Sequence, residues 1–351
     1  MSKKVLTIIL VIVIVALTGF MIWGMAPSSG LGWNQSEWVS FNCSGFHFGG
    51  FASGGRLPED AQKGTSYETD TAGISGIDLN FQQENIEVTV WDKDIVRVEQ
   101  ISDAALPDED IMRFGTIGSE LAIQSGNYGK IITGIRPRST IKLYIPQKSG
   151  LNIKCSTASG YVHAGGGKYA LLRIDTASGE TSLSGVNAKD VEVDTASGRV
   201  KIEDVDCKQL KIDSASGDIT VSGVCERNMD IDTSSGSITV NAQTESLKVD
   251  TASGSVAAEI SGLRVFDVDT ASGNVRLACR DAQALQEIKI GTMSGEVEID
   301  LPENDGFEVD FDSISGRVQY NGFEVYNDAY ANETIQIGVD TVSGDLRITK
   351  K

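Results

Sequence analysis

The chain has 351 residues and a net charge of −19, with 38 glycines but only 6 prolines. Such an acidic surface excludes a binding mode built on phosphate contacts, which needs clustered lysine and arginine, so we expect no nucleic-acid partner. A hydrophobic content of 40% is ample for a packed core and argues against a disordered chain.

The N-terminal part, residues 1–26, predicts a membrane anchor. Residues 5–25 form an apolar run of about 20 residues, long enough to cross a bilayer as a transmembrane helix. Lys3 and Lys4 precede this run and place the N-terminus in the cytoplasm. A cleaved secretory signal is the alternative, although Pro27 directly after the best cleavage site disfavours it. We therefore expect a single-pass protein of the cell membrane with an extracytoplasmic C-terminal domain.

Two less regular regions follow the anchor. Residues 27–69 are rich in glycine, serine and aromatic residues without periodicity, and they predict a tether or a segment resting at the membrane–water interface. Residues 70–150 contain short runs in which apolar and polar residues alternate, which predicts strands with one wet face. Because these runs share no common period, we expect an irregular β region that caps the repeats that follow.

The most regular feature, in residues 151–351, is a repeated Thr/Ser-x-Ser-Gly tetrad. The ten tetrads end at Gly160, Gly179, Gly198, Gly217, Gly236, Gly254, Gly273, Gly295, Gly316 and Gly344. Six of the nine spacings lie within one residue of 19, which is typical of a stacked repeat. The prediction is an all-β protein: a parallel β-solenoid, or β-helix, of about ten coils of ~19 residues, preceded by the transmembrane helix.

Apolar residues recur at fixed distances from each tetrad. The positions seven and five before the glycine are Ile153 and Cys155 in the first repeat, Leu172 and Ile174 in the second. The positions two and four after the glycine are almost always apolar too, with Thr181 as an exception. Each coil is therefore expected to contain two short strands, joined at the tetrad, that face a shared core.

The tetrad itself reads as a turn. An aspartate stands four residues before the glycine in eight of ten repeats, and we expect it to accept a hydrogen bond from the backbone two residues on. The glycine is expected to supply a left-handed conformation. Calcium binding by the aspartates, or a threonine ladder for carbohydrate or ice, are alternative hypotheses for these columns.

A column of charges indicates how the coils stack. Six residues before the glycine the charges are Arg173, Glu192, Lys211, Asp230, Lys248, Asp267, Lys289 and Asp310. Their sign alternates over eight consecutive repeats, which fits parallel, in-register stacking at ~4.8 Å between coils. At the C-terminus, Arg347, Lys350 and Lys351 are expected to guard the exposed edge of the last coil.

No residue pattern predicts catalysis. The five cysteines are odd in number and have no metal-binding spacing, and Cys155 takes a core position, so we expect no disulfide framework. His47 lies in the tether and His163 at an outward strand position. We therefore expect no enzyme, no catalytic, cofactor-binding or metal-binding residues, and no cofactor.

The repeats resemble a bacterial family of β-strand-repeat domains, provisionally labelled an adhesin domain of unknown function. The resemblance rests on Asp-Thr-Ala-Ser-Gly at residues 175–179, 194–198, 250–254 and 269–273, and on the strand at residues 141–146. It covers about residues 70–350 and implies a cell-envelope setting. We expect a non-enzymatic surface interaction module, an adhesin or envelope scaffold, whose partner is an envelope protein or polysaccharide. The alternative is an envelope-stress sensor that acts through a partner membrane protein.

Overall fold

The computed structural model describes residues 57–58, 60–126, 137–147, 149–332 and 334–351, together with the backbone of two short strands near the N-terminus. The chain divides into two compact units, Met1–Ser53 and Gly54–Lys351. In the first unit, β1 (Asn42–Cys43) pairs antiparallel with β2 (Phe46–His47). The predicted transmembrane helix at residues 5–25 lies outside the described residues.

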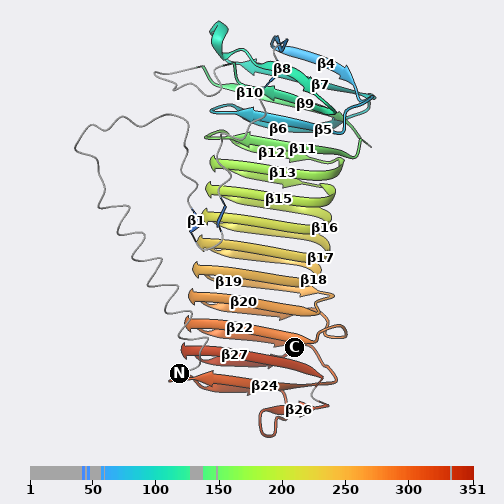
Figure 1. Ribbon diagram of the computed structural model, residues 1–351. Coiled ribbons are helices and arrows are strands. Elements are labelled where there is room, and N and C mark those ends of the chain that lie inside the picture. Colours follow the sequence, from blue (N-terminus) through green and yellow to red (C-terminus); the bar gives the residue numbers. More distant parts are fainter. Residues whose placement is uncertain are drawn as a thin grey trace, which may run out of the picture. The chain divides into compact units, whose positions relative to one another are not determined.

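The second unit is all-β, and most of its strands join one long, mainly parallel sheet with a solenoid-like course (Figure 1). Its N-terminal strands are β3 (Gln62–Lys63), β4 (Ser66–Asp70), β5 (Gly76–Phe81), β6 (Asn85–Trp91), β7 (Ile95–Ser102), β8 (Arg113–Ile117), β9 (Glu120–Gln124) and β10 (Ser139–Pro146). A single turn of 3₁₀ helix, η1 (Asp108–Asp110), lies between β7 and β8. None of the helices in the described residues has the length and apolar character to span a membrane.

The tetrad repeats supply the remaining strands. They are β11 (Leu151–Thr157), β12 (Val162–Gly165), β13 (Lys168–Ser178), β14 (Thr181–Ser184), β15 (Asn187–Ser197), β16 (Val200–Ser216), β17 (Ile219–Ser235), β18 (Ile238–Ser253), β19 (Val256–Ser261), β20 (Val265–Ser272), β21 (Val275–Cys279), β22 (Glu287–Ser294), β23 (Val297–Leu301), β24 (Gly306–Ser313), β25 (Val318–Asn321), β26 (Ala329–Ala331), β27 (Ile335–Ser343) and β28 (Leu346–Lys350). In β16, β17 and β18 the strand after one tetrad runs on into the strand before the next.

The strands form two parallel ladders, one made of the segments before each tetrad and one of the segments after it. In the pre-tetrad ladder, for example, Ile174 of β13 pairs with Val193 of β15. In the post-tetrad ladder, Val200 of β16 pairs with Ile219 of β17. Inward-facing residues of both ladders are buried in one continuous core, as the apolar periodicity predicts. For the described residues of the second unit, the prediction of an all-β fold with mostly parallel, in-register pairing is confirmed.

The stack extends into the region before the first tetrad. β5 and β6 pair in parallel with β11 and β12, so residues 76–91 form a coil without a tetrad. Beyond this coil, β9 and β10 add in parallel to β5 and β6. β7 then pairs antiparallel with β10, and β8 pairs antiparallel with β9. The strands at the end of the predicted tether add to these: β4 pairs with β7, and β3 pairs with β8.

The C-terminal coils do not stack in chain order, which corrects the predicted continuous series. β22 and β23 pair with β27 and β28, and those strands in turn pair with β24 and β25 (Figure 1). The last coil of the chain is therefore inserted between its two predecessors. Gly338 consequently separates Lys289 from Asp310, so the charge alternation does not continue directly between those two side chains.

The same insertion overturns the predicted edge guard. Because β28 lies between β23 and β25, its basic residues are not at the end of the stack. Arg347 and Lys351 instead form ion pairs with Glu298 and Asp300 of β23, each with an N–O distance of 2.9 Å. The end of the stack is formed by β24 and β25. β26 pairs with part of β24, and the Phe323 and Tyr330 rings pack on Phe307.

Engineered disulfides test this coil order. Glu298 pairs with Arg347, and Arg347 pairs with Gln319, so Glu298 and Gln319 are two strands apart. We expect Glu298→Cys with Arg347→Cys to form a disulfide under mild oxidation, since directly paired strands place the Cα atoms ~4.8 Å apart. The matched pair Glu298→Cys with Gln319→Cys should remain unlinked. Peptide mapping by mass spectrometry detects the disulfide in either variant. If the coils were stacked in chain order, the Glu298–Gln319 pair would be linked and the Glu298–Arg347 pair would not.

Candidate functional site

At the tetrad corners the backbones of adjacent coils lie very close together. A Cβ atom at each tetrad glycine from Gly179 onward would overlap the carbonyl oxygen of the tetrad glycine in the adjacent coil, far inside the 3.0 Å that real Cβ atoms respect. Six of these glycines also have φ between +126° and +151°, a range that favours glycine. Close approach of the coils, more than the predicted left-handed turn alone, therefore requires glycine here.

The threonine column of the tetrads points into the molecule. Thr176, Thr195 and Thr292 are each no more than 3% exposed. Thr176 and Thr195 hydroxyls lie 3.0 Å apart in adjacent coils, and Thr292 donates to the carbonyl oxygen of Ser294 at 3.3 Å. The alternative of a threonine ladder for carbohydrate or ice is therefore wrong, because the hydroxyls are inaccessible.

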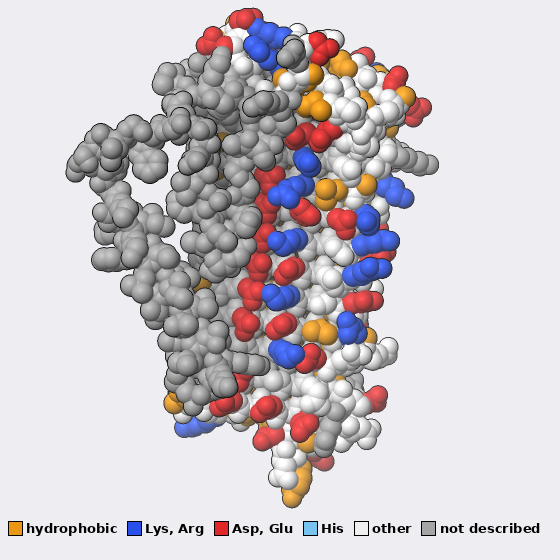
Figure 2. Space-filling view, in the orientation of Figure 1, with side chains coloured by type: hydrophobic (Ala, Val, Ile, Leu, Met, Phe, Trp, Pro, Cys, Tyr) orange, Lys and Arg blue, Asp and Glu red, His pale blue; other side chains and the backbone are white. Residues whose placement is uncertain are grey.

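In the part of the chain that the structure describes, the aspartates before the tetrads lie within strands and not at the predicted turn. They stand on the outer side of the pre-tetrad ladder, where in-register pairing stacks one carboxylate on the next (Figure 2). We call this column the carboxylate ladder; its members are Asp175, Asp194, Asp213, Asp232, Asp250 and Asp269. Like charges directly paired across strands are unfavourable, so this arrangement needs compensation from neighbouring cations.

The alternating charge column supplies that compensation. Arg173 contacts three carboxylates, those of Asp175 at 3.2 Å, Glu192 at 3.0 Å and Asp194 at 2.6 Å. Lys211 pairs with Asp213 at 2.6 Å, and Lys248 pairs with Asp250 in the same way. Figure 2 shows acidic side chains alongside a column in which acidic and basic side chains alternate. Cations therefore reach only some coils of the carboxylate ladder.

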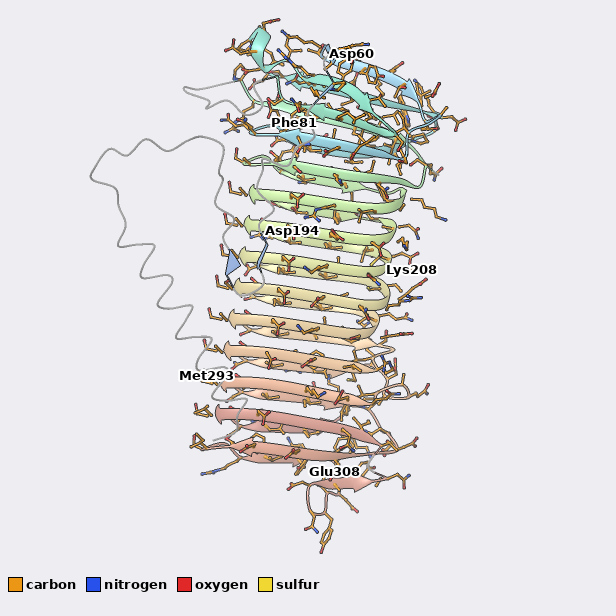
Figure 3. All side chains as sticks on the ribbon, viewed as in Figure 1. Asp60, Phe81, Asp194, Lys208, Met293 and Glu308 are labelled. Atoms are coloured by element: carbon orange, nitrogen blue, oxygen red, sulfur yellow. The ribbon has the colours of Figure 1, made fainter. Side chains whose placement is uncertain are left out.

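Burial and crowding change the proton affinity of the ladder. The pKa of Asp194, labelled in Figure 3, is raised to about 8. Burial is the main cause and the neighbouring Asp175 the next, while Arg173 opposes the shift. The pKa of Asp232 is raised to about 7, mainly by burial and then by the nearby carboxylates of Asp230, Asp250 and Asp213. One oxygen of Asp232 is buried without a hydrogen-bond partner. Asp194 and Asp232 are thus two members of the ladder that bind protons near neutral pH.

Other candidate residues have structural surroundings. In the described residues, no group of three or more histidine, cysteine, aspartate or glutamate side chains could hold a metal ion. The cysteines described with side chains, Cys155, Cys207, Cys225 and Cys279, are buried and free. His163 stacks on Tyr161 with ring centroids 4.2 Å apart, while the side chain of His47 lies outside the description.

Sequence reasoning missed a hollow of about 390 Å³ beside the loop that connects β6 to β7. Trp91, Lys93, Gln147 and Ser149 are among its lining residues. The Trp91 ring is fixed by a hydrogen bond from its Nε1 to the carbonyl oxygen of Ile95 at 2.8 Å, and Lys93 Nζ lies 4.7 Å from the ring centroid. Trp91, directly before the charged residues 92–94, was its only signal in the sequence. Because Lys93 already occupies a face of the ring, the hollow offers no free aromatic platform.

Residues 74–284, more than half of the chain, match the family Toastrack DUF4097. The chain belongs to this family. The matched segment begins just before β5 and ends after β21, so the toastrack domain contains the coil without a tetrad as well as the regular repeats. No curated protein sequence matches the chain.

The solved structures that match this chain share little sequence with it. A proposed cell adhesion protein of Clostridium sporogenes is 14% identical, with a TM-score of 0.28, over 83% of this chain and 100% of its own. A proposed lipid binding protein of Parabacteroides distasonis is 18% identical, with a TM-score of 0.42, over 82% and 96%. A proposed adhesin of Bacteroides fragilis is 12% identical, with a TM-score of 0.36, over 84% and 100%. These likenesses carry no argument about ligand or partner.

Substitution of a tetrad glycine tests the corner packing. We expect Gly236→Ala to lower the free energy of unfolding by about 2–4 kcal/mol, because its Cβ would overlap the Gly217 carbonyl. The matched control is Gly185→Ala, at φ +63° with open space around its Cβ, which should cost only about 1 kcal/mol. Chemical denaturation measures the free energy of unfolding of both variants. An equal decrease in the two would refute the role of close approach.

The pH dependence of stability tests the carboxylate ladder. The folded-state pKa of Asp232 is raised to about 7, so the protonated carboxyl contributes to the free energy of unfolding. This contribution is complete below about pH 4 and is lost as pH rises through 7. We therefore expect Asp232→Asn to match the wild type near pH 4 and to be more stable by on the order of 1–2 kcal/mol at pH 8. The control is Glu226→Gln, an exposed carboxylate of β17 in the same stack. Thermal unfolding at several pH values gives the comparison, and parallel pH profiles for all three proteins would contradict it.

Proposed function

We propose that the protein is a membrane-anchored β-solenoid of about ten coils that acts as a non-enzymatic interaction module outside the cytoplasmic membrane. The apolar run at residues 5–25, with Lys3 and Lys4 before it, supports the anchor and its orientation. The family assignment fits an adhesin-like role without naming a ligand. The partner is an envelope protein or polysaccharide.

The parallel register is the observation that carries this proposal. It sets exposed side chains in straight columns with one contact per coil at ~4.8 Å, on strands held by a continuous core. Such a surface offers many equivalent, weak contacts in a row instead of one deep cleft. An extended partner gains affinity from several such contacts together, which suits an adhesin or an envelope scaffold.

Protease accessibility tests the proposed topology. With the full chain carrying different tags at its two ends in bacterial protoplasts, we expect added protease to remove the C-terminal tag and spare the N-terminal one. Permeabilised protoplasts, in which both tags are lost, provide the control. Protection of the C-terminal tag would contradict an extracytoplasmic domain, and release of a shortened chain into the medium would show signal cleavage instead of anchoring.

Capture from envelopes tests the interaction role. The full chain, tagged at its C-terminus, is recovered from detergent-treated envelopes with or without prior protease or polysaccharide-degrading enzymes. We expect one treatment to abolish co-recovery and so to identify the partner as protein or polysaccharide. Lys211→Gln with Lys248→Gln should weaken retention if the charge column takes part, with Lys201→Gln on the post-tetrad ladder as control. Failure to retain any envelope component would count against the proposal, and stable recovery of one membrane protein would favour the sensor alternative.

A further inference from the structure

The final coil of the stack leaves a strand edge without a strand partner. β24 pairs with β27 on one side from Phe307 to Ser313, but on the other side it pairs with β26 only from Gly306 to Glu308. In the described part of the chain, no strand pairs with the outer edge of β24 beyond Glu308. About half of this strand therefore has one neighbour only.

The free edge carries backbone groups with a known direction. The Val309 N–H donates to the carbonyl oxygen of Asp328 at 2.9 Å, on the side away from β27. In a strand, the N–H and C=O of alternate residues point to the same side, so Phe311 and Ser313 direct theirs to this edge as well. Within the described residues these groups have no strand partner, which makes them available for pairing.

The side chains along this edge are acidic and lack cations. Glu308, Asp310 and Asp312 alternate along β24 and are exposed; Glu308 is labelled in Figure 3. Their register neighbours on β27 include Gly338 and Asp340, neither of which is basic. No ion pair to these three carboxylates occurs among the described residues. Coils nearer the centre differ, because Lys211 and Lys248 lie beside their aspartates.

The stacking register indicates which side chains an additional strand beside β24 would need. Along the alternating column, each charged side chain has an opposite charge in the adjacent coil as far as Lys289, after which Gly338 intervenes and Asp310 ends the stack. A strand added to β24 would place its own side chain ~4.8 Å from Asp310. A lysine or arginine there would restore the alternation and neutralise a carboxylate that has no cation.

We propose that the outer edge of β24 binds an extended, basic segment of a partner protein, which adds to the stack as a further strand. The segment would pair with the backbone of Phe311 and Ser313 and set lysine or arginine side chains opposite Asp310 and Asp312. Ile314, 73% exposed at the following turn, offers an apolar contact beside the added strand. The inference rests on the proposed role as an interaction module and narrows the partner to protein.

The same features disfavour a second copy of this chain as the occupant. Two β24 edges brought together would set three acidic side chains of each copy against those of the other, and like charges across paired strands are unfavourable. A polysaccharide would meet the carboxylates but could not form a regular ladder with the backbone edge. A basic strand satisfies both the charges and the backbone groups.

Binding of a synthetic peptide to the purified full-length protein tests the proposal. The probe is a fluorescent heptapeptide that alternates lysine and valine, and its binding is followed by fluorescence anisotropy. We expect saturable binding that weakens as salt rises. The same peptide with glutamate for lysine should not bind. Two further peptides are N-methylated at all lysines or at all valines; one of the two should lose binding, because a strand presents only one set of its N–H groups to the edge.

Variants locate the site. Asp310→Lys with Asp312→Lys should weaken binding of the lysine peptide at least about tenfold and confer binding of the glutamate peptide. The matched control is Asp267→Asn, an acid of the same column whose register neighbours Lys248 and Lys289 lie inside the stack, and it should bind as the wild type does. Circular dichroism checks that every variant retains its β structure.

Three results would overturn the proposal. They are no binding of the lysine peptide, equal binding of both N-methylated peptides, or a loss of peptide affinity in Asp267→Asn as large as that in the Asp310→Lys, Asp312→Lys variant. The second would reduce the effect to charge attraction without strand pairing. None of these results depends on envelope capture, so the proposed function could hold while the β24 site fails. Loss of both peptide binding and envelope capture would instead count against the interaction role itself.

Discussion

Close backbone approach at the tetrad corners is the constraint on which the rest of the structure depends. At each corner the glycine lies so near the carbonyl of the adjacent coil that a Cβ atom has no room. This contact holds neighbouring coils at the spacing of paired strands and aligns them residue for residue. The two ladders, the continuous core and the columns of side chains on the surface all follow from that alignment. A slip of one residue at a corner would turn the apolar face outward.

Strict alignment has an electrostatic consequence. Residues at equivalent repeat positions become neighbours, so a residue that recurs in every repeat is stacked on copies of itself. For the threonines the repetition brings no charge repulsion: the hydroxyls of Thr176 and Thr195 bond to each other, and that of Thr292 bonds to the backbone. For the aspartates it is unfavourable, and the raised pKa of Asp232 reflects burial first and then the neighbouring carboxylates. The alternating column is then understandable, because changing the sign at each coil avoids a second row of like charges beside the first.

The periodic part of the fold was predictable from the sequence because each coil contacts only its neighbours. Apolar residues at fixed distances from the tetrad specify the strands, the core and the register, and the structure agrees. The role of the aspartates was not predictable in this way. A position four residues before a glycine fits both a turn cap and an outward strand residue, and only the backbone path between Asp175 and Gly179 distinguishes them. Coil order at the C-terminus was likewise hidden, since the 28-residue gap before Gly344 reads as an ordinary insertion.

The inserted coil also changes how the end of the stack must form. Among the described strands, β24 and β25 pair only with β26, β27 and β28, all of which come later in the chain. They therefore have no strand neighbour until the last coil is in place, whereas every earlier tetrad coil can add directly to its predecessor. The segment at residues 321–334 provides the length needed for the chain to return, and its Phe323 and Tyr330 pack on Phe307 of β24. The acidic edge thus exists only once the whole chain has folded, because the strand that displays it is held from behind by the C-terminal coil.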